Sequence, residues 1–171
     1  MAEFKKIILP ILGVAVFICL VGYLYRNPPN PGPTSTLKQS PVKISNISLT
    51  VEEATSQEER EKGLSGKAGL EKDKGMLFTL GKTNSIPAFW MKGMKFAIDI
   101  VWILSSSGDV KKGKIIQIDK NVPVPEAGTP DSGLKRYSPK IPVEYVLEVG
   151  AGFCDENKIK VGDNFEIQSG Q

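Results

Sequence analysis

The chain has 171 residues, of which 40% are hydrophobic and 24% charged, and its formal net charge at pH 7 is +3. This length accommodates one globular domain and an appendage, and the small, dispersed charge argues against a nucleic-acid partner. The absence of histidine excludes histidine-dependent triads and dyads and histidine-ligated zinc. Because Cys19 lies in an apolar N-terminal run, Cys154 has no partner for an intradomain disulfide. No metal or cofactor is expected.

The N-terminus carries an uncharged apolar run at residues 7–25, which as a helix would measure about 28 Å and cross a bilayer core. Lys5 and Lys6 precede the run and Arg26 follows it, which favours a cytoplasmic N-terminus. We therefore predict a cytoplasmic tip at 1–6 and a single-pass membrane anchor, with the rest of the chain periplasmic or extracellular. A cleavable signal peptide, which would give a secreted protein, is the alternative.

A linker is predicted at residues 26–41, where five prolines are mixed with serine and threonine. Such a composition builds no core and adopts extended, semi-rigid conformations. We expect this flexible linker to hold a globular domain, residues 42–168, away from the membrane. Residues 169–171 form the tail.

The first elements of the domain are a strand and a short helix. Residues 43–54 alternate loosely between apolar and polar positions, which predicts a strand. Ser56 precedes Glu59 by three residues in a capping-box arrangement, so a short helix is expected to start there and to stop at Gly63. The apolar run 75–80 predicts a further strand.

The longest predicted strand spans residues 96–104, where alternation places Trp102 on one face and Asp99 on the other. A turn at 105–109 predicts a hairpin with a returning strand at 110–118.

The C-terminal part begins with residues 119–142, which are rich in proline and glycine and predict a long, mostly irregular loop. Strands are predicted at 143–149 and 165–167, with a short helix at 151–157. Short strands and two brief helices predict a mainly β fold, a single compact β-sandwich or barrel-like domain after the anchor and linker.

Four segments carry a family resemblance: EREKGLSGKAGLEKDKGMLF, FWMKGMKFAIDIVWIL, SPKIPVEYVLEVGAGF and IKVGD. Their order and spacing resemble the domain-of-unknown-function family 192 across residues 47–167. The resemblance implies a mainly β, exported or membrane-anchored prokaryotic protein, and it brings no established activity. Departures from the family's pattern at 65–67 and 93–94 weaken the idea of a fixed polar site there. Five positions remain as candidate ligand-binding residues, namely Trp90, Met91, Lys92, Asp99 and Glu148.

Asp99 is the single acid of its predicted strand. A charged partner or a set of hydrogen bonds is expected, because burying an unpaired carboxylate costs several kcal/mol. The candidate partners are Lys92, Lys95, Arg60 and Arg136. Two interpretations stay open: a structural group that pairs with a cation or holds the backbone amides of a loop, and a pocket acid with a raised pKa.

The FWMK segment joins Trp90, Met91 and Lys92. Trp90 fits either a pocket wall, where an indole stacks on a ligand, or the core. Trp102 is expected in the core, since it shares its face with apolar side chains. Met91 and Met94 are expected to fill the core rather than to bind a metal.

Glu148 is expected on the polar, solvated face of its strand. Together with Asp99 it would form a two-carboxylate hydrolytic site if the carboxyl groups were suitably spaced. Two hypotheses follow. The first is a non-catalytic ligand-binding or accessory module, with a pocket near FWMK for a small molecule, a carbohydrate or another envelope protein. The second is a hydrolase or lyase of cell-envelope carbohydrate that uses both acids.

Overall fold

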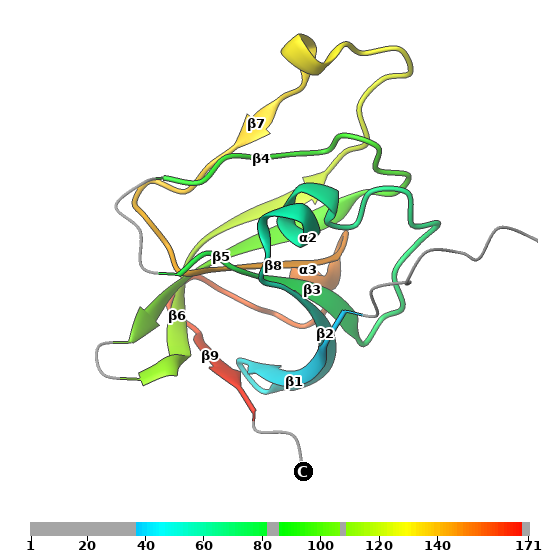
Figure 1. The fold of residues 1–171 in the computed structure, drawn as a ribbon. Helices are drawn as coiled ribbons and strands as arrows, with labels where there is room; N and C mark the ends of the chain where they lie inside the picture. Colours follow the sequence, from blue (N-terminus) through cyan, green and yellow to red (C-terminus); the bar gives the residue numbers. More distant parts are fainter. Residues whose placement is uncertain (1–36, 82–85, 107–108, 169–171) are drawn as a thin grey trace, which may run out of the picture. The chain divides into compact units, whose positions relative to one another are not determined.

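The computed structural model describes residues 37–81, 86–106 and 109–168. In this part of the chain seven strands form a closed barrel, and two short strands pair separately beside it (Figure 1). The barrel order is β1–β2–β3–β8–β5–β6–β9. Neighbouring strands are antiparallel, except that β2 and β3 are parallel. The predicted mainly β, barrel-like fold is confirmed.

The barrel strands are β1 (Gln39–Ile44), β2 (Ile47–Ala54), β3 (Lys74–Thr79), β5 (Ile98–Ser106), β6 (Asp109–Val122), β8 (Tyr145–Gly150) and β9 (Asn164–Ile167). The separate pair consists of β4 (Phe89–Trp90) and β7 (Arg136–Tyr137). The helices are α2 (Gln57–Lys62), α3 (Phe153–Glu156) and the 3₁₀ helix η1 (Asp131–Gly133).

The domain opens with a hairpin where the sequence predicted one strand at 43–54. The chain reverses at Ser45, whose φ is 54°, so that Ile44 and Ile47 pair across a tight turn. Strand β1 already begins at Gln39, so residues 39–41 belong to the barrel and not to the predicted linker. Pro41 hid this strand, because proline disfavours strand interiors.

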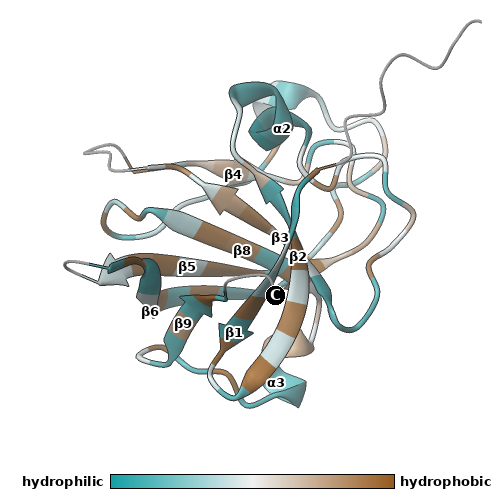
Figure 2. Ribbon diagram, turned by 60° about the horizontal axis from the view of Figure 1, so that its bottom comes forward, coloured by the Kyte–Doolittle hydropathy of each residue, from teal (hydrophilic) through white to brown (hydrophobic). Residues whose placement is uncertain are grey.

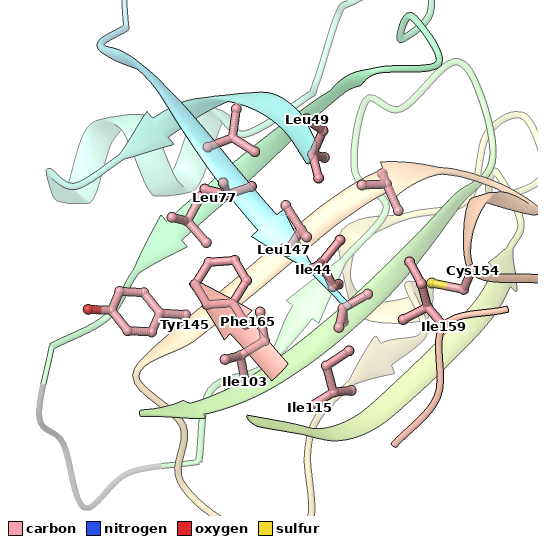
Figure 3. Packing of buried hydrophobic residues seen from close by; sticks show 14 of the residues in the cluster. Ile44, Leu49, Leu77, Ile103, Ile115, Tyr145, Leu147, Cys154, Ile159 and Phe165 are labelled. Atoms are coloured by element: carbon pink, nitrogen blue, oxygen red, sulfur yellow. The ribbon is translucent and has the colours of Figure 1, made fainter. Parts of the chain in front are cut away.

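The central strands are hydrophobic along much of their length, which is visible as brown stretches along β5 and β8 (Figure 2). One cluster draws residues from all seven barrel strands and fills the interior, and Leu147, Ile103 and Phe165 belong to it (Figure 3). A second cluster, which includes Trp102 and Val146, lies on the outer face. Trp102 is completely buried, as predicted. The outer face is therefore a second core, closed by segments outside the barrel.

The predicted loop at 119–142 contains more regular structure than expected. Strand β6 continues to Val122, where it pairs with Ile98, and η1 and β7 follow within the same stretch. The irregular part shrinks to residues 123–130 and the connections around η1 and β7. Pairing with β4 provides β7 with its hydrogen-bonded partner, and this long-range contact leaves no local signal in the sequence.

No helix among the described residues is long and apolar enough to cross a membrane. The predicted anchor at 7–25 and the linker up to residue 36 lie outside the described residues.

Candidate functional site

Phe89 packs the FWMK segment against the outer face of the barrel. Its ring packs edge to face on Phe78 at 4.9 Å and on Trp102 at 5.5 Å, measured between ring centroids. Trp90 points the opposite way along β4 and is 40% exposed. It pairs with Arg136 on β7, whose guanidinium carbon lies 4.6 Å above the indole centroid. A cation–π contact thus positions Trp90 at the surface.

The second wall comes from α2 and the turn that follows it. Ser56 caps the helix by accepting a hydrogen bond from the Glu59 amide, while the Glu59 carboxylate accepts one from the Ser56 amide at 2.8 Å. The Ser56 amide and the Thr55 amide, which donates to the same carboxylate at 2.9 Å, lower the pKa of the Glu59 carboxyl to about 2. Gly63 ends the helix with a φ of 48°, so the predicted helix and both of its signals are confirmed.

The turn after α2 docks onto the FWMK segment. The Gly66 amide donates to the Gly93 carbonyl at 3.0 Å, and Gly93 itself has a φ of 69°. A Cβ atom at Gly93 would collide with the Ser65 hydroxyl, so only glycine permits this close approach. Figures 1 and 2 both show α2 beside β4.

Between these walls lies a cavity of about 230 Å³, hereafter the Glu148 cavity. Most of its lining is apolar, and its polar and charged lining residues other than Glu148 are hereafter called the rim. Its walls include Leu64, Phe78, Leu80, Phe89, Trp90 and Met94, its rim includes Gln57, Arg60, Glu61, Lys62, Ser65 and Lys92, and Glu148 also lines it.

Glu148 lies on β8 between two apolar strands. Its cross-strand neighbours are Met76 on β3 and Ile100 on β5, which are at most 1% exposed, and Glu148 itself is only 6% exposed. The predicted solvated face is therefore wrong, because α2 and the FWMK segment cover this side of the sheet. Burial alone raises the pKa of the Glu148 carboxyl to about 8, so the group is mostly uncharged at pH 7.

The Glu148 carboxyl has no hydrogen-bond partner within the described part of the chain, and burial is the one influence on its pKa. Among these residues every fully sealed side-chain nitrogen or oxygen atom does have a partner. The Glu148 oxygens must therefore open into the cavity that the residue lines.

The rim charges are partly engaged elsewhere. Arg60 donates to the Thr55 carbonyl and, at 3.4 Å, to the Thr79 carbonyl. Lys92 forms an exposed ion pair with Asp131 at 2.5 Å, a kind of pair that contributes little to stability. Such a lysine can exchange its partner for a ligand at small cost.

Asp99 lies on the opposite face of the sheet from Glu148. It pairs with Val149 of the interior cluster and is completely buried. Its carboxylate accepts hydrogen bonds from the amides of Asn121 at 2.8 Å, Gly152 at 3.3 Å and Cys154 at 2.9 Å. Of the two interpretations, the structure supports the carboxylate that holds loop amides.

None of the four cations expected near Asp99 forms an ion pair with it in the described residues. Lys92 pairs with Asp131, Arg60 with backbone carbonyls, and Arg136 with the Trp90 ring. Of the two kinds of partner expected, the structure shows hydrogen bonds, donated by the Asn121 amide of β6 and by the Gly152 and Cys154 amides at the start of α3.

The candidate residues thus divide into two groups. Trp90, Lys92 and Glu148 converge on one cavity, whereas Asp99 does not line it. Met91 is 3% exposed and belongs to the outer core, as does Met94, so the expectation that they fill the core is confirmed.

Sequence reasoning missed the contributions of Arg60, Phe78 and Leu64 to the cavity. The capping box located α2 correctly, yet nothing local indicated that this helix borders the FWMK segment thirty residues later. The GLSGK turn was the one local signal of this contact, since its two glycines indicate a backbone that another segment approaches closely.

The fold and site define a small closed β-barrel domain with a lateral cavity on its outer face. The chain belongs to the family DUF192, described as an uncharacterised ACR, whose model matches residues 40–167. This confirms the resemblance drawn from the sequence. A search of curated proteins gave no match.

Two solved structures share the fold. One is a candidate transcription regulator from Sinorhizobium meliloti 1021, 29% identical, with a TM-score of 0.66 over 77% of this chain and 95% of that one. The other is a protein of unknown function from Novosphingobium aromaticivorans DSM 12444, 23% identical, with a TM-score of 0.63 over 78% of this chain and 89% of that one.

Proposed function

We propose that this chain is a membrane-tethered, extracytoplasmic module that binds a small molecule in the Glu148 cavity without transforming it. The observation that carries the proposal is Glu148, a nearly buried acid that opens into an apolar cavity and has no partner among the described residues. The tether rests on the apolar run at 7–25 and its flanking lysines.

A ligand would supply what Glu148 lacks. No described residue gives the Glu148 carboxyl a hydrogen bond, and a ligand that forms one in this apolar setting would gain about 0.5–1.5 kcal/mol from it. Apolar walls with a few polar groups are the usual composition of small-molecule sites. The barrel contributes Phe78 on β3 and Glu148 on β8 to the lining, so part of the site is built on paired strands.

The hydrolase hypothesis finds no support in the geometry. Two catalytic carboxyl groups must flank the same scissile bond, roughly 5–9.5 Å apart. Asp99 and Glu148 lie on opposite faces of one sheet, and both Asp99 oxygens accept backbone hydrogen bonds. They cannot act on one substrate from these positions.

The proposal is tested with the full-length chain, labelled with ¹⁵N at tryptophan, in lipid nanodiscs. A panel of small aromatic acids, amides, amines and monosaccharides is added while the indole N–H resonances are recorded. We expect at least one class to shift the Trp90 resonance more than that of Trp102, which is buried and bonded to Asp119 at 2.6 Å. If no compound moves Trp90, the proposed site is wrong.

A further inference from the structure

Resting on the proposed small-molecule site, we propose that the Glu148 cavity selects ring compounds that carry no positive charge and that accept a hydrogen bond from Glu148 through a carbonyl or carboxylate oxygen. The chemistry follows from three features of the described residues: the donor at Glu148, the charges of the rim and the occupied face of Trp90.

The Glu148 carboxyl acts as a donor because its surroundings disfavour the carboxylate. Its neighbours on the flanking strands, Met76 and Ile100, offer neither charge nor hydrogen bond. The acids one strand further out are already engaged, Glu52 with Lys67 at 2.7 Å and Asp119 with the Trp102 indole. A neutral carboxyl has an O–H to donate, and no described residue accepts it, so a ligand with a carbonyl or carboxylate oxygen would complete the pair.

The charged rim opposes a cationic ligand. Three of its side chains are basic, namely Arg60, Lys62 and Lys92, and one is acidic, Glu61. Asp131 pairs with Lys92, so with Glu148 uncharged Arg60 and Lys62 against Glu61 leave one net positive charge, which favours neutral or anionic molecules. The Glu61 carboxylate also accepts a hydrogen bond from Gln57 at 2.8 Å, which reduces its capacity to attract a cation.

Trp90 would be the natural place for a cation, yet one face of its ring is already taken. The Arg136 guanidinium lies 4.6 Å from the indole centroid. A second cation on the other face of the same ring would be repelled by the first and would compete for the same π electrons. The free face is better suited to stacking by a neutral ring.

The size and the walls of the cavity favour one ring over a sugar. A volume of about 230 Å³ is below the usual range of roughly 300–1,000 Å³ for drug-sized ligands. Leu64, Phe78, Phe89 and Met94 cannot satisfy a set of hydroxyl groups. A single aromatic ring that carries one carbonyl or carboxylate group fits both the volume and the apolar walls of the cavity.

The test compares four probes of similar size on the full-length chain in nanodiscs: benzamide, benzoate, benzylammonium and methyl glucoside. Dissociation constants are measured by Trp90 indole shifts at pH 6 and pH 9. At pH 6, where Glu148 carries its proton, we expect benzamide and benzoate to bind at least tenfold more tightly than the other two. Because Glu148 titrates near pH 8, benzamide should lose about tenfold in affinity between the two pH values.

Two variants distinguish the role of Glu148 as a hydrogen-bond donor from the role of its charge. Glu148→Gln keeps an N–H donor, so it should bind benzamide at both pH values with little difference between them. Glu148→Ala removes the donor and should weaken benzamide about tenfold at pH 6. Circular dichroism of each variant shows whether the barrel is intact.

The inference is overturned if benzylammonium or methyl glucoside binds most tightly. It is also overturned if the affinity of the unaltered chain for benzamide does not depend on pH, or if Glu148→Gln abolishes benzamide binding. Each of these results still leaves a ligand in the cavity. Failure of the whole panel to shift Trp90 would instead remove the proposed function itself.

Discussion

Replacing Glu148 by glutamine should stabilise the protein at neutral pH and leave it unchanged in acid. The pKa of the carboxyl rises from 4.5 to about 8 on folding because of burial. Between these values the unfolded chain releases its proton while the native chain keeps it, so native stability falls as pH rises. Each pH unit is worth about 1.4 kcal/mol, which gives about 3 kcal/mol at pH 7 and about 5 kcal/mol above pH 8. Glutamine has no proton to lose and escapes this cost.

The assay is urea unfolding of both proteins at pH 4, 7 and 9, monitored by tryptophan fluorescence. Other titrating groups are common to the two chains and cancel in the difference. Glu166→Gln is the matched control, because this carboxyl is 45% exposed and pairs only loosely with Lys112 at 3.7 Å. A stability difference between Glu148→Gln and the unaltered chain that is the same at pH 4 and pH 9 would refute the reasoning.

Three further predictions concern the framework of the site. Asp99→Asn should lower the free energy of unfolding in urea by about 2–4 kcal/mol, because the side-chain amide cannot accept all three backbone hydrogen bonds. Benzamide binding at pH 6 should persist in this variant. A variant as stable as the unaltered chain would contradict the prediction. Gly93→Ala should lower the free energy of unfolding by about 1–2 kcal/mol, because the φ of this residue is positive. Adding Ser65→Ala should remove the collision with the new Cβ atom but not this backbone strain. Full recovery of stability in the double variant would show that the backbone is unstrained. Cys154 is completely buried, and burial and the nearby Asp99 raise the pKa of its thiol. It should therefore resist maleimide in the native protein and react in urea. Rapid labelling of Cys154 in the native protein, located by peptide mapping, would count against the described packing.

Local signals in the sequence located local structure well. The capping box at Ser56 and Glu59 and the stop at Gly63 depend on neighbours within one turn of helix, so the pattern was sufficient. The core position predicted for Trp102, which shares its strand face with apolar side chains, is confirmed. The family-specific segments likewise identified the family before any fold was known.

Glu148 shows where such reasoning stops. Alternation divides a strand into two faces but does not say what covers each face. One face of the predicted strand 143–149 looks solvated because it carries Glu144 and Glu148, yet Val146 between them is completely buried. The cover comes from α2 and β4, which approach only through long-range packing. The same limit concealed β7, whose partner β4 lies far away in the sequence.

The central claim is that Glu148 is a neutral, unpartnered acid at a ligand cavity. Its direct test is the ¹³C chemical shift of the Glu148 carboxyl carbon, followed from pH 4 to pH 10. The account predicts a midpoint near 8, which moves higher when benzamide accepts the proton's hydrogen bond. A midpoint near 4.5, the value of an exposed glutamate, would contradict it.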